Sequence, residues 1–323
     1  MKALVTGANG FIGLPVCAEL QRRGWQVTGA VRAPCQLPAG VVPASIGAVD
    51  GETNWIEALR GVDAVVHLAA RSSLMHDSAA DPLAAFRAVN VAGTLSLARQ
   101  AGAAGVKRFV FASSVKVNGE STPVGRAFTE TDAVNPQDAY GLSKHEAEQG
   151  LREIAAQTGM ALVIIRAPLV YGPGVKGNFA ALMRAVQRGW PLPLGAVHNK
   201  RSLVALDNLV DFIITCLNHP HAANQTFLVS DGHDLSTTEL VRGLALAAGV
   251  PVRLLPVPVW ALQAGAALLG RGAAVQRLCG NLQVDISKAH TLLGWAPPVS
   301  SDEGLRQAVA GMDCHGLRPR SDN

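Results

Sequence analysis

The first twenty residues constrain the fold more than any other stretch of the sequence. Residues 3–5 (ALV) form a short, wholly apolar run that leads into residues 6–13 (TGANGFIG). Such a run is typical of a strand buried on both faces of a parallel sheet. Behind the glycines, Ile12, Val16 and Leu20 recur at helical spacing. The pattern therefore predicts a strand, a tight glycine turn and a helix.

The three glycines of this turn have separate predicted roles. Gly7 allows a tight exit from the strand, Gly10 leaves room for a pyrophosphate against bare backbone, and Gly13 lets the helix pack closely on the strand. The free N–H groups at the start of the helix would face the phosphates, with the helix dipole adding to the attraction. A lone glycine triplet is a weak signal, but a triplet placed between strand and helix predicts a bound dinucleotide.

Composition narrows the class of protein. Of the 323 residues, 49% are apolar and 16% charged, which favours a compact enzyme over a disordered or nucleic-acid-binding chain. The net charge of +4 is spread without any run of Lys or Arg, so no nucleic-acid partner is expected. The five cysteines are scattered without metal-binding spacing, which predicts reduced thiols and no metal site.

The sequence also bears on location. The chain opens directly with a predicted strand, so we expect no signal peptide and a cytoplasmic protein. The most membrane-like segment, residues 257–269, has about 13 residues, whereas a helix that spans a bilayer needs about 20. We therefore expect a core helix in this segment and no membrane partner.

Strand and helix patterns alternate along the chain, which predicts an α/β fold with a Rossmann-type doubly wound parallel sheet. The expected strands cover residues 26–31, 41–46, 63–70 and 108–112. The expected helices cover residues 55–59, 81–101 and 140–157. Further along, helices are expected at residues 179–188 and 207–218.

Three polar side chains raise specific expectations. Sites for NAD usually place Asp or Glu after the second strand, whereas this chain has Arg32. A guanidinium suits a 2′-phosphate, so NADP(H) is favoured and NAD(H) is the alternative, unless Arg32 stacks on adenine or points to solvent. Asn90 lies in an apolar helical stripe and needs partners, either in a neighbouring strand or on the cofactor. His67 lies inside an apolar run and is predicted to be a core residue.

The chemistry is expected on the next two elements. The strand at residues 108–112 leads into Ser113 and Ser114, at the sheet edge where ligands of doubly wound folds bind. Tyr140 and Lys144 are spaced i, i+4, which places the phenol and the ammonium on one helix face. A neighbouring cation would lower the phenol pKa toward neutrality, so that the pair can exchange a proton with a carbonyl or an alcohol.

Six motifs together resemble one family. They are TGxNGxIG, HLAA, VNVxGT, the strand-end SS, YxxxK and RAPxVYGPG, in this order. From residue 1 to about 309 the chain resembles the extended short-chain dehydrogenase/reductase family, of the nucleotide-sugar epimerase/dehydratase type. The resemblance implies a smaller C-terminal α/β substrate domain and hydride exchange at a UDP-linked sugar. It also implies that Tyr140 is the acid/base, that Lys144 bridges the cofactor ribose, and that Ser114 binds the reacting oxygen.

The same resemblance implies the binding residues. Cofactor contacts would come from Gly7, Gly10, Phe11, Ile12, Gly13, Val49, Ala69, Ala70, Asn90, Ser113, Tyr140, Lys144 and Pro168, together with Arg32. The UDP moiety would be held by Asn178, Arg201 and Arg277, although each arginine could equally be a surface ion-pair partner. The expected partners are this UDP-linked sugar and, as one option, a second copy in a homodimer.

The expected domain division follows the motifs. Residues 1–171, with about 201–224, would form the dinucleotide-binding domain. Residues 172–200 and 225–312 would form the nucleotide-sugar-binding domain. The polar tail, residues 313–323, is expected to fray.

Departures from the family pattern bear on the activity. Dehydratases of the family carry an Asp-Glu pair where this chain has Val115 and Lys116, so no dehydration is expected. Epimerases of the family often have Asn where Leu169 stands, so contacts to the substrate diphosphate would have to be rearranged.

The motifs lead to three hypotheses for the function of the protein. The motifs look most like bacterial C4-ketoreductases of UDP-4-keto-6-deoxy-N-acetylhexosamines, which make precursors of surface polysaccharide, and such an NAD(P)H-dependent enzyme is the first hypothesis. A UDP-sugar 4-epimerase with tightly bound NAD is the second. A non-catalytic nucleotide sensor is the third, and it is disfavoured because binding alone needs none of Ser114, Tyr140 and Lys144.

Overall fold

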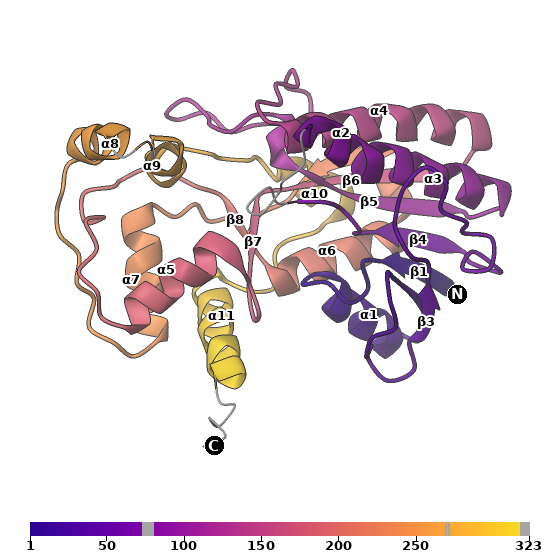
Figure 1. Ribbon diagram of the computed structural model, residues 1–323, viewed down its shortest axis with the longest axis horizontal. Coiled ribbons are helices and arrows are strands. Elements are labelled where there is room, and N and C mark those ends of the chain that lie inside the picture. Colours follow the sequence, from indigo (N-terminus) through magenta and orange to yellow (C-terminus); the bar gives the residue numbers. More distant parts are fainter. Residues whose placement is uncertain (73–80, 269, 271, 317–323) are drawn as a thin grey trace.

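The computed structural model describes residues 1–72, 81–268, 270 and 272–316. Figure 1 shows two lobes side by side, a larger one built on a twisted sheet and a smaller one that is mainly helical. The N-terminus lies in the larger lobe, at the opposite end from the helices of the smaller lobe.

The larger lobe is a seven-stranded parallel sheet in the order β3-β2-β1-β4-β5-β6-β9. Its strands are β1 (Lys2–Thr6), β2 (Gln26–Val31), β3 (Val42–Ser45), β4 (Ala64–His67), β5 (Arg108–Ser114), β6 (Ala161–Ala167) and β9 (Gln225–Leu228). The strand order reverses between β1 and β4, which is the switch point where doubly wound sheets bind ligands. The predicted Rossmann-type fold is confirmed.

Helices cover both faces of this sheet (Figure 1). One face packs against α1 (Gly13–Arg22) and α6 (Leu206–Asn218), and the other against α3 (Thr94–Ala103) and α4 (Ala139–Thr158). Within β1, Val5 packs on the side of α1 and α6, whereas Leu4 packs on the side of α3 and α4. Side chains alternate along a strand, so a strand covered on both faces must be apolar throughout.

The smaller lobe has an apolar core of its own. Helices α5 (Gly177–Gln187), α7 (Thr237–Ala247) and α11 (Ser301–Gly316) pack around a two-stranded parallel sheet of β7 (Leu169–Tyr171) and β8 (Leu203–Ala205). The remaining α-helices of the described chain are α2 (Pro82–Arg87), α8 (Val259–Leu268), α9 (Gly272–Cys279) and α10 (Ser287–Leu293). Tyr171 is fully buried in this core, and its hydroxyl donates to Asp231 Oδ2 at 2.7 Å.

The lobes share more chain than the predicted division assumes. Residues 225–312 are expected in the second domain, yet β9 forms the edge of the large sheet beside β6. Trp295 and the buried side chains of α10 also pack in the core of the larger lobe. Helix α11 continues to Gly316 and so includes residues 313–316 of the tail, and the rest of that tail lies outside the described residues. Fraying of the tail stays a prediction.

The helix predicted over residues 81–101 is interrupted. Asp81 caps α2 as expected, since its carboxylate accepts a backbone N–H of the first turn at 3.0 Å. The chain then passes through a π-helix, η1 (Ala88–Gly93), before α3 begins. The wider turn holds the buried Asn90, whose amide is hydrogen bonded to other segments of the chain.

The helix predicted over residues 55–59 is wrong. Residues 56–60 form turns, and Trp55 is fully buried with its backbone N–H donated to Gln100 Oε1 at 2.8 Å. Burial of one large indole thus decides the path of this segment, because a helical pattern only a few residues long is a weak preference.

A helix forms within residues 257–269 as predicted, but the prediction that it is a buried core helix is wrong. Helix α8 forms there, but Trp260 is 72% exposed and Leu268 is 89% exposed. One face of α8 is covered, since Val259 and Leu262 pack against the core of the smaller lobe and Ala266 is buried, whereas the opposite face is left exposed. Among the described residues, no helix combines the length and the apolar character that crossing a bilayer requires.

Phe212 of α6 tests the packing of this helix on the sheet. Its fully buried ring lies 5.6 Å from the Phe227 ring and 4.6 Å from the Trp295 ring, between centroids. We expect Phe212→Ala to lower the free energy of unfolding by about 3 to 5 kcal/mol, because the change removes these contacts and leaves a cavity. Urea unfolding followed by circular dichroism measures the loss.

A matched control is Val124→Ala, at a residue that is 90% exposed. It should change the free energy of unfolding by about 0.5 kcal/mol or less. A Phe212 variant as mild as this control would contradict the packing described for α6.

Candidate active site

A cavity of about 320 Å³ lies at the carboxyl ends of β1, β4 and β5. Its lining includes the predicted cofactor residues Gly7, Gly10, Phe11, Ile12, Gly13, Ala70, Ser113 and Pro168 and the predicted catalytic residues Ser114, Tyr140 and Lys144. These residues are far apart in the sequence, and the parallel sheet brings them to one edge because all its strands end there.

The glycine turn is shaped for close approach of backbone and ligand. Gly7 has a φ of +65°, and a Cβ on it would lie 3.1 Å from the Ala69 nitrogen. A Cβ on Gly13 would lie 2.0 Å from the Gly7 carbonyl oxygen, so only glycine lets α1 begin this close to the turn. Ile12, the N-cap, contributes no side-chain hydrogen bond. The Leu14 N–H donates to the Gly10 carbonyl at 3.1 Å, and Pro15 has no N–H, so an anion would bind at the N–H groups of residues 11–13, before the bonds of the helix begin. These residues fit the pyrophosphate of a dinucleotide.

His67 is a core residue, as the sequence predicts. It is fully buried, with Nδ1 2.7 Å from Thr6 Oγ1 and Nε2 2.8 Å from Thr94 Oγ1. Burial lowers the pKa of His67 to about 3, and the charge of Lys144 adds to the effect. Thr6 Oγ1 also accepts the Ala69 N–H at 3.1 Å, so these bonds join β1, β4 and α3 beside the glycine turn. Thr6 is not among the residues predicted from the sequence, although a hydroxyl at the end of a buried strand could have indicated it.

Tyr140 and Lys144 lie one turn apart at the start of α4. Asp138 caps this helix, and its carboxylate accepts the Gly141 N–H at 2.7 Å. The Lys144 ammonium donates to the Ala112 carbonyl at 2.8 Å and lies 6.0 Å from the centroid of the Tyr140 ring. The cap thus fixes the start of the helix, and the helix places the phenol and the ammonium in one cavity.

Burial sets the pKa values of this pair. It lowers the pKa of Lys144 to about 7, against the opposing effect of the Glu148 charge. It raises the pKa of Tyr140 to about 12, and the Asp138 carboxylate adds to the rise. The prediction that Lys144 brings the phenol pKa toward neutrality is therefore wrong for the protein's own groups. They hold Tyr140 protonated at neutral pH, as a proton donor.

A buried ion pair supports the strand end that carries the two serines. Ser113 Oγ donates to Glu148 Oε1 at 2.6 Å, and Arg166 donates to the two Glu148 oxygens at 2.9 and 2.6 Å. Burial acts to raise the pKa of Glu148, but the hydrogen bonds and charge of Arg166 outweigh it and lower that pKa. This network is not among the features predicted from the sequence, although an acidic residue one turn after Lys144 and an arginine inside an apolar strand could have indicated it.

Ser114 and Lys116 lie where β5 passes into a short 3-10 helix, η2 (Val115–Val117). Ser114 Oγ accepts the Lys116 N–H at 3.2 Å, and a hydroxyl that accepts can still donate to a ligand. The Lys116 ammonium forms ion pairs with Glu120 at 2.9 Å and with Asp138. Where dehydratases of the family have the second carboxylate of their Asp-Glu pair, this chain therefore has a cation that is paired with two carboxylates. The lack of dehydratase activity stays a prediction, which this pairing supports.

Asn90 has a structural role. Its amide oxygen accepts the Arg71 N–H at 2.8 Å, and its amide nitrogen donates to the Arg71 carbonyl and to Ser143 Oγ, both at 3.0 Å. These bonds join η1 to the segment after β4 and to α4, which is the structural one of the two alternatives. Val49 is buried in the core beside α3, and Arg32 is exposed just beyond β2. Cofactor contacts of these three residues stay predictions.

The three predicted substrate residues are not in the lining described for this cavity. Arg201 Nη1 donates to the Gly280 carbonyl at 3.1 Å, and burial lowers the pKa of its guanidinium. Asn178 is exposed in the first turn of α5, and Arg277 is exposed on α9. Their contact with a UDP moiety therefore stays a prediction.

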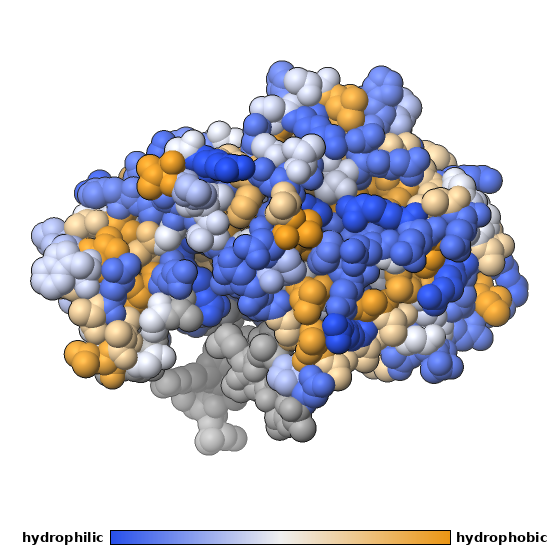
Figure 2. All heavy atoms as spheres, turned by 90° about the horizontal axis from the view of Figure 1, so that it is seen from above, coloured by the Kyte–Doolittle hydropathy of each residue, from blue (hydrophilic) through white to orange (hydrophobic). Residues whose placement is uncertain are grey.

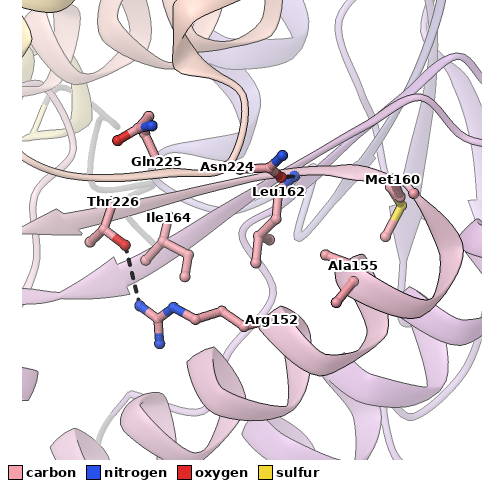
Figure 3. Close-up of a pocket in the computed structure, with 10 residues that line it drawn as sticks. Arg152, Ala155, Met160, Leu162, Ile164, Asn224, Gln225 and Thr226 are labelled. Carbon is pink, nitrogen blue, oxygen red and sulfur yellow. Dashed lines mark hydrogen bonds between the residues drawn. The ribbon is translucent and has the colours of Figure 1, made fainter.

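A second cavity, of about 330 Å³, lies between the later part of α4, β6 and β9 (Figure 3). The Arg152 guanidinium donates to Thr226 Oγ1 at 3.2 Å and also pairs with Glu148 at 3.1 Å. The other residues described in its lining are apolar or neutral, among them Leu162 and Asn224. This lining offers neither a phosphate-binding turn nor an acid/base pair, so the first cavity is the candidate active site.

Comparison with known proteins decides the family. The model of the NAD dependent epimerase/dehydratase family matches residues 3–230, which is more than half of the chain. The chain belongs to this family. Its membership confirms the resemblance of the motifs, and it makes the protein an NAD-dependent enzyme of the epimerase/dehydratase type.

Several relatives match nearly the whole chain. A UDP-glucose 4-epimerase of Vibrio cholerae is 49% identical over 308 residues, which cover 95% of this chain and 94% of that protein. The N-acetyl-alpha-D-glucosaminyl-diphospho-ditrans,octacis-undecaprenol 4-epimerase of Escherichia coli O157:H7 is 28% identical, with coverage of 95% and 93%. The structure of a Thermotoga maritima UDP-glucose 4-epimerase with UDP-glucose superposes with a TM-score of 0.78 at 25% identity, with coverage of 98% and 99%. Both lobes of this chain therefore have counterparts in the Thermotoga maritima structure.

The buried Lys144 ammonium makes stability depend on pH. Its folded pKa of about 7 lies below the unfolded value of about 10.4, so between these values the unfolded chain binds more protons. Stability should therefore rise between about pH 7 and about pH 8.5, by at most about 1.4 kcal/mol per pH unit. Lys144→Met should remove this dependence and raise the thermal midpoint near pH 7, because a buried charge is replaced by an apolar chain of similar length.

Thermal midpoints measured across this pH range check the prediction. Lys107→Met, at an exposed lysine, is the matched control and should keep the dependence of the parent. If Lys144→Met showed the same rise with pH as the parent, burial of this ammonium would not be its cause.

Proposed function

We propose that the protein is a UDP-hexose 4-epimerase that works with bound NAD. The observation that carries the proposal is the single cavity in which the glycine turn, Ser114, Tyr140 and Lys144 meet. The 49% identity to a protein named UDP-glucose 4-epimerase, over 95% of this chain, supports inversion at C4 in particular. The E. coli relative is also named for a 4-epimerase of a diphosphate-linked sugar.

Each part of the cavity has its own role in this proposal. The glycine turn and the N–H groups of residues 11–13 bind the cofactor pyrophosphate. Lys144, held by the Ala112 carbonyl, binds the cofactor ribose and keeps positive charge near the phenol of Tyr140. Ser114 donates a hydrogen bond to the C4 oxygen of the sugar. NAD, when bound, supplies the centre that accepts the C4 hydride and returns it.

Tyr140 moves the proton of the C4 hydroxyl. Because its pKa is about 12 with the protein's own groups, the phenol ionises only when further positive charge lies beside it. The phenolate then takes the proton as the hydride leaves C4, and the phenol gives it back as the hydride returns. Inversion at C4 requires the keto sugar to turn within the site, so that the hydride returns to the opposite face of C4.

A second candidate is the C4-ketoreductase of a UDP-4-keto-6-deoxy-N-acetylhexosamine, acting in the synthesis of surface polysaccharide precursors. The observation that favours it is Arg32, which is exposed just beyond β2 where an NAD site usually has a carboxylate. A guanidinium there suits the 2′-phosphate of NADPH, the cofactor preference that belongs to this candidate. Such an enzyme uses Ser114 and Tyr140 in the same roles but must exchange its cofactor at every turnover.

One pair of assays separates the two candidates. We expect the purified protein to interconvert UDP-glucose and UDP-galactose, or UDP-GlcNAc and UDP-GalNAc, without consuming reduced cofactor, because an epimerase regenerates its NAD in each cycle. Proton NMR follows the sugars, and absorbance follows added NADH or NADPH with a UDP-4-keto-6-deoxy-N-acetylhexosamine. Stoichiometric oxidation of NADH or NADPH without any C4 inversion would replace the epimerase by the reductase.

Tyr140→Phe tests the acid/base. Loss of the hydroxyl should lower turnover about 10² to 10⁴-fold while cofactor affinity and folding stay close to those of the parent, because the ring still packs on Phe86. Tyr171 is the other tyrosine of the chain, and Tyr171→Phe removes a buried hydroxyl of the smaller lobe. Turnover per folded molecule should survive that control. A Tyr140→Phe enzyme within a factor of about two of the parent would refute the assignment.

A further inference from the structure

The smaller lobe exposes apolar side chains that its core does not explain. Val252, Leu255, Trp260, Leu268 and Leu278 are 43%, 50%, 72%, 89% and 39% exposed, and we call them the α8 patch. They belong to the stretch that contains α8 and α9, two helices that pack against each other. Of the side chains described in α8, Ala266 is the one classed as buried. Figure 2 shows apolar side chains at the end of the molecule where Figure 1 places these helices.

An exposed tryptophan and arginine lie next to this stretch. The loop after α5 pairs with the segment before α8, since the Leu192 N–H donates to the Arg253 carbonyl and the Leu255 N–H donates to the Leu192 carbonyl, both at 2.8 Å. At the start of this loop, Trp190 is 55% exposed, and the Arg188 guanidinium lies 5.5 Å from the centroid of its ring. The surface therefore combines indole rings, aliphatic side chains and guanidinium groups.

The two stretches of sequence that form this surface contain basic residues and no acidic ones. Residues 172–206 and 240–284, which include the α8 patch and the loop after α5, contain nine of the 28 Lys and Arg residues and none of the 24 Asp and Glu residues. The rest of the chain therefore has 19 basic residues against 24 acidic ones and is net acidic. Within these stretches Arg188, Arg253 and Arg277 are exposed, so basic side chains accompany the exposed apolar ones, which is the pattern of a surface for an anionic partner.

The basic residues beside the α8 patch also favour one partner for this patch over another. A second copy placed on the α8 patch would bring the exposed arginines of two such stretches together, which is electrostatically unfavourable. A bilayer with anionic lipids offers negative charge for the arginines and an apolar layer for the leucines. Tryptophan is enriched at the boundary between these layers, and arginine can extend from an apolar surface to a charged headgroup. A helix of ten residues is too short to span a bilayer but can lie in its interface.

We propose that the α8 patch docks the protein on the surface of a membrane that carries anionic lipids, with α8 in the plane of the interface. The expectation of no membrane partner rests on the length needed to span a bilayer, and that length does not bear on a helix that lies on one. The proposal is independent of the sugar epimerised, because the patch lies outside the lining of the active-site cavity.

Vesicle binding tests the proposal. The full chain should float with phosphatidylcholine vesicles that contain phosphatidylglycerol about tenfold better than with phosphatidylcholine vesicles alone, and added salt should weaken binding. Trp260→Glu and Leu268→Glu should each weaken binding about tenfold or more, because each replaces an inserted apolar group by a charge of the lipid's sign. Both residues are highly exposed, so the variants should keep the fold and the C4 activity of the parent.

The matched controls are Ile56→Glu and Val124→Glu, at residues of the larger lobe that are 65% and 90% exposed. They add the same charge outside the patch and should bind vesicles within about twofold of the parent. Binding that is absent from both kinds of vesicle, or equally weakened by patch and control variants, overturns the proposal. So does sedimentation velocity that shows a dimer of the parent and a monomer of Leu268→Glu, since the patch would then be covered by a second copy.

Discussion

One buried carboxylate joins the elements that carry the chemistry. Glu148 of α4 accepts hydrogen bonds from Ser113 at the end of β5 and from Arg166 of β6, and Arg166 also binds Asn118 beyond η2. Removing these charges from water is costly, and only a complete set of partners offsets the cost. Lys144 lies one helical turn before Glu148, so the network that fixes α4 on the sheet also fixes where the ammonium and the phenol lie.

The sequence was sufficient where a single local constraint decides the structure. A positive φ at Gly7 and the near contact at Gly13 each admit only glycine, so the turn is readable from its letters. The i, i+4 spacing of Tyr140 and Lys144 follows from helix geometry alone. Because the sheet is parallel, placing strands in order was enough to bring these parts and Ser114 to one edge, and most of the candidate site followed from that.

Prediction failed where distant contacts or burial decide the outcome. The buried indole of Trp55 and the buried amide of Asn90 each set a backbone path that local pattern does not contain. The phenol pKa of Tyr140 was misjudged because spacing shows a neighbouring cation but not the loss of water around both groups. The hydropathy of α8 shows that its side chains are apolar, but it does not show whether other parts of the protein cover them.

The path of the chain has a consequence for how the molecule folds. Helix α6 and strand β9 of the larger lobe come after α5 of the smaller one. Until α6 is in place, the sheet face around Val5 and Val66 is open to water, and until β9 pairs, β6 is a free edge that could recruit another chain. During synthesis, therefore, the larger lobe cannot close before most of the smaller one has been made. The two lobes should therefore unfold together, as one cooperative unit.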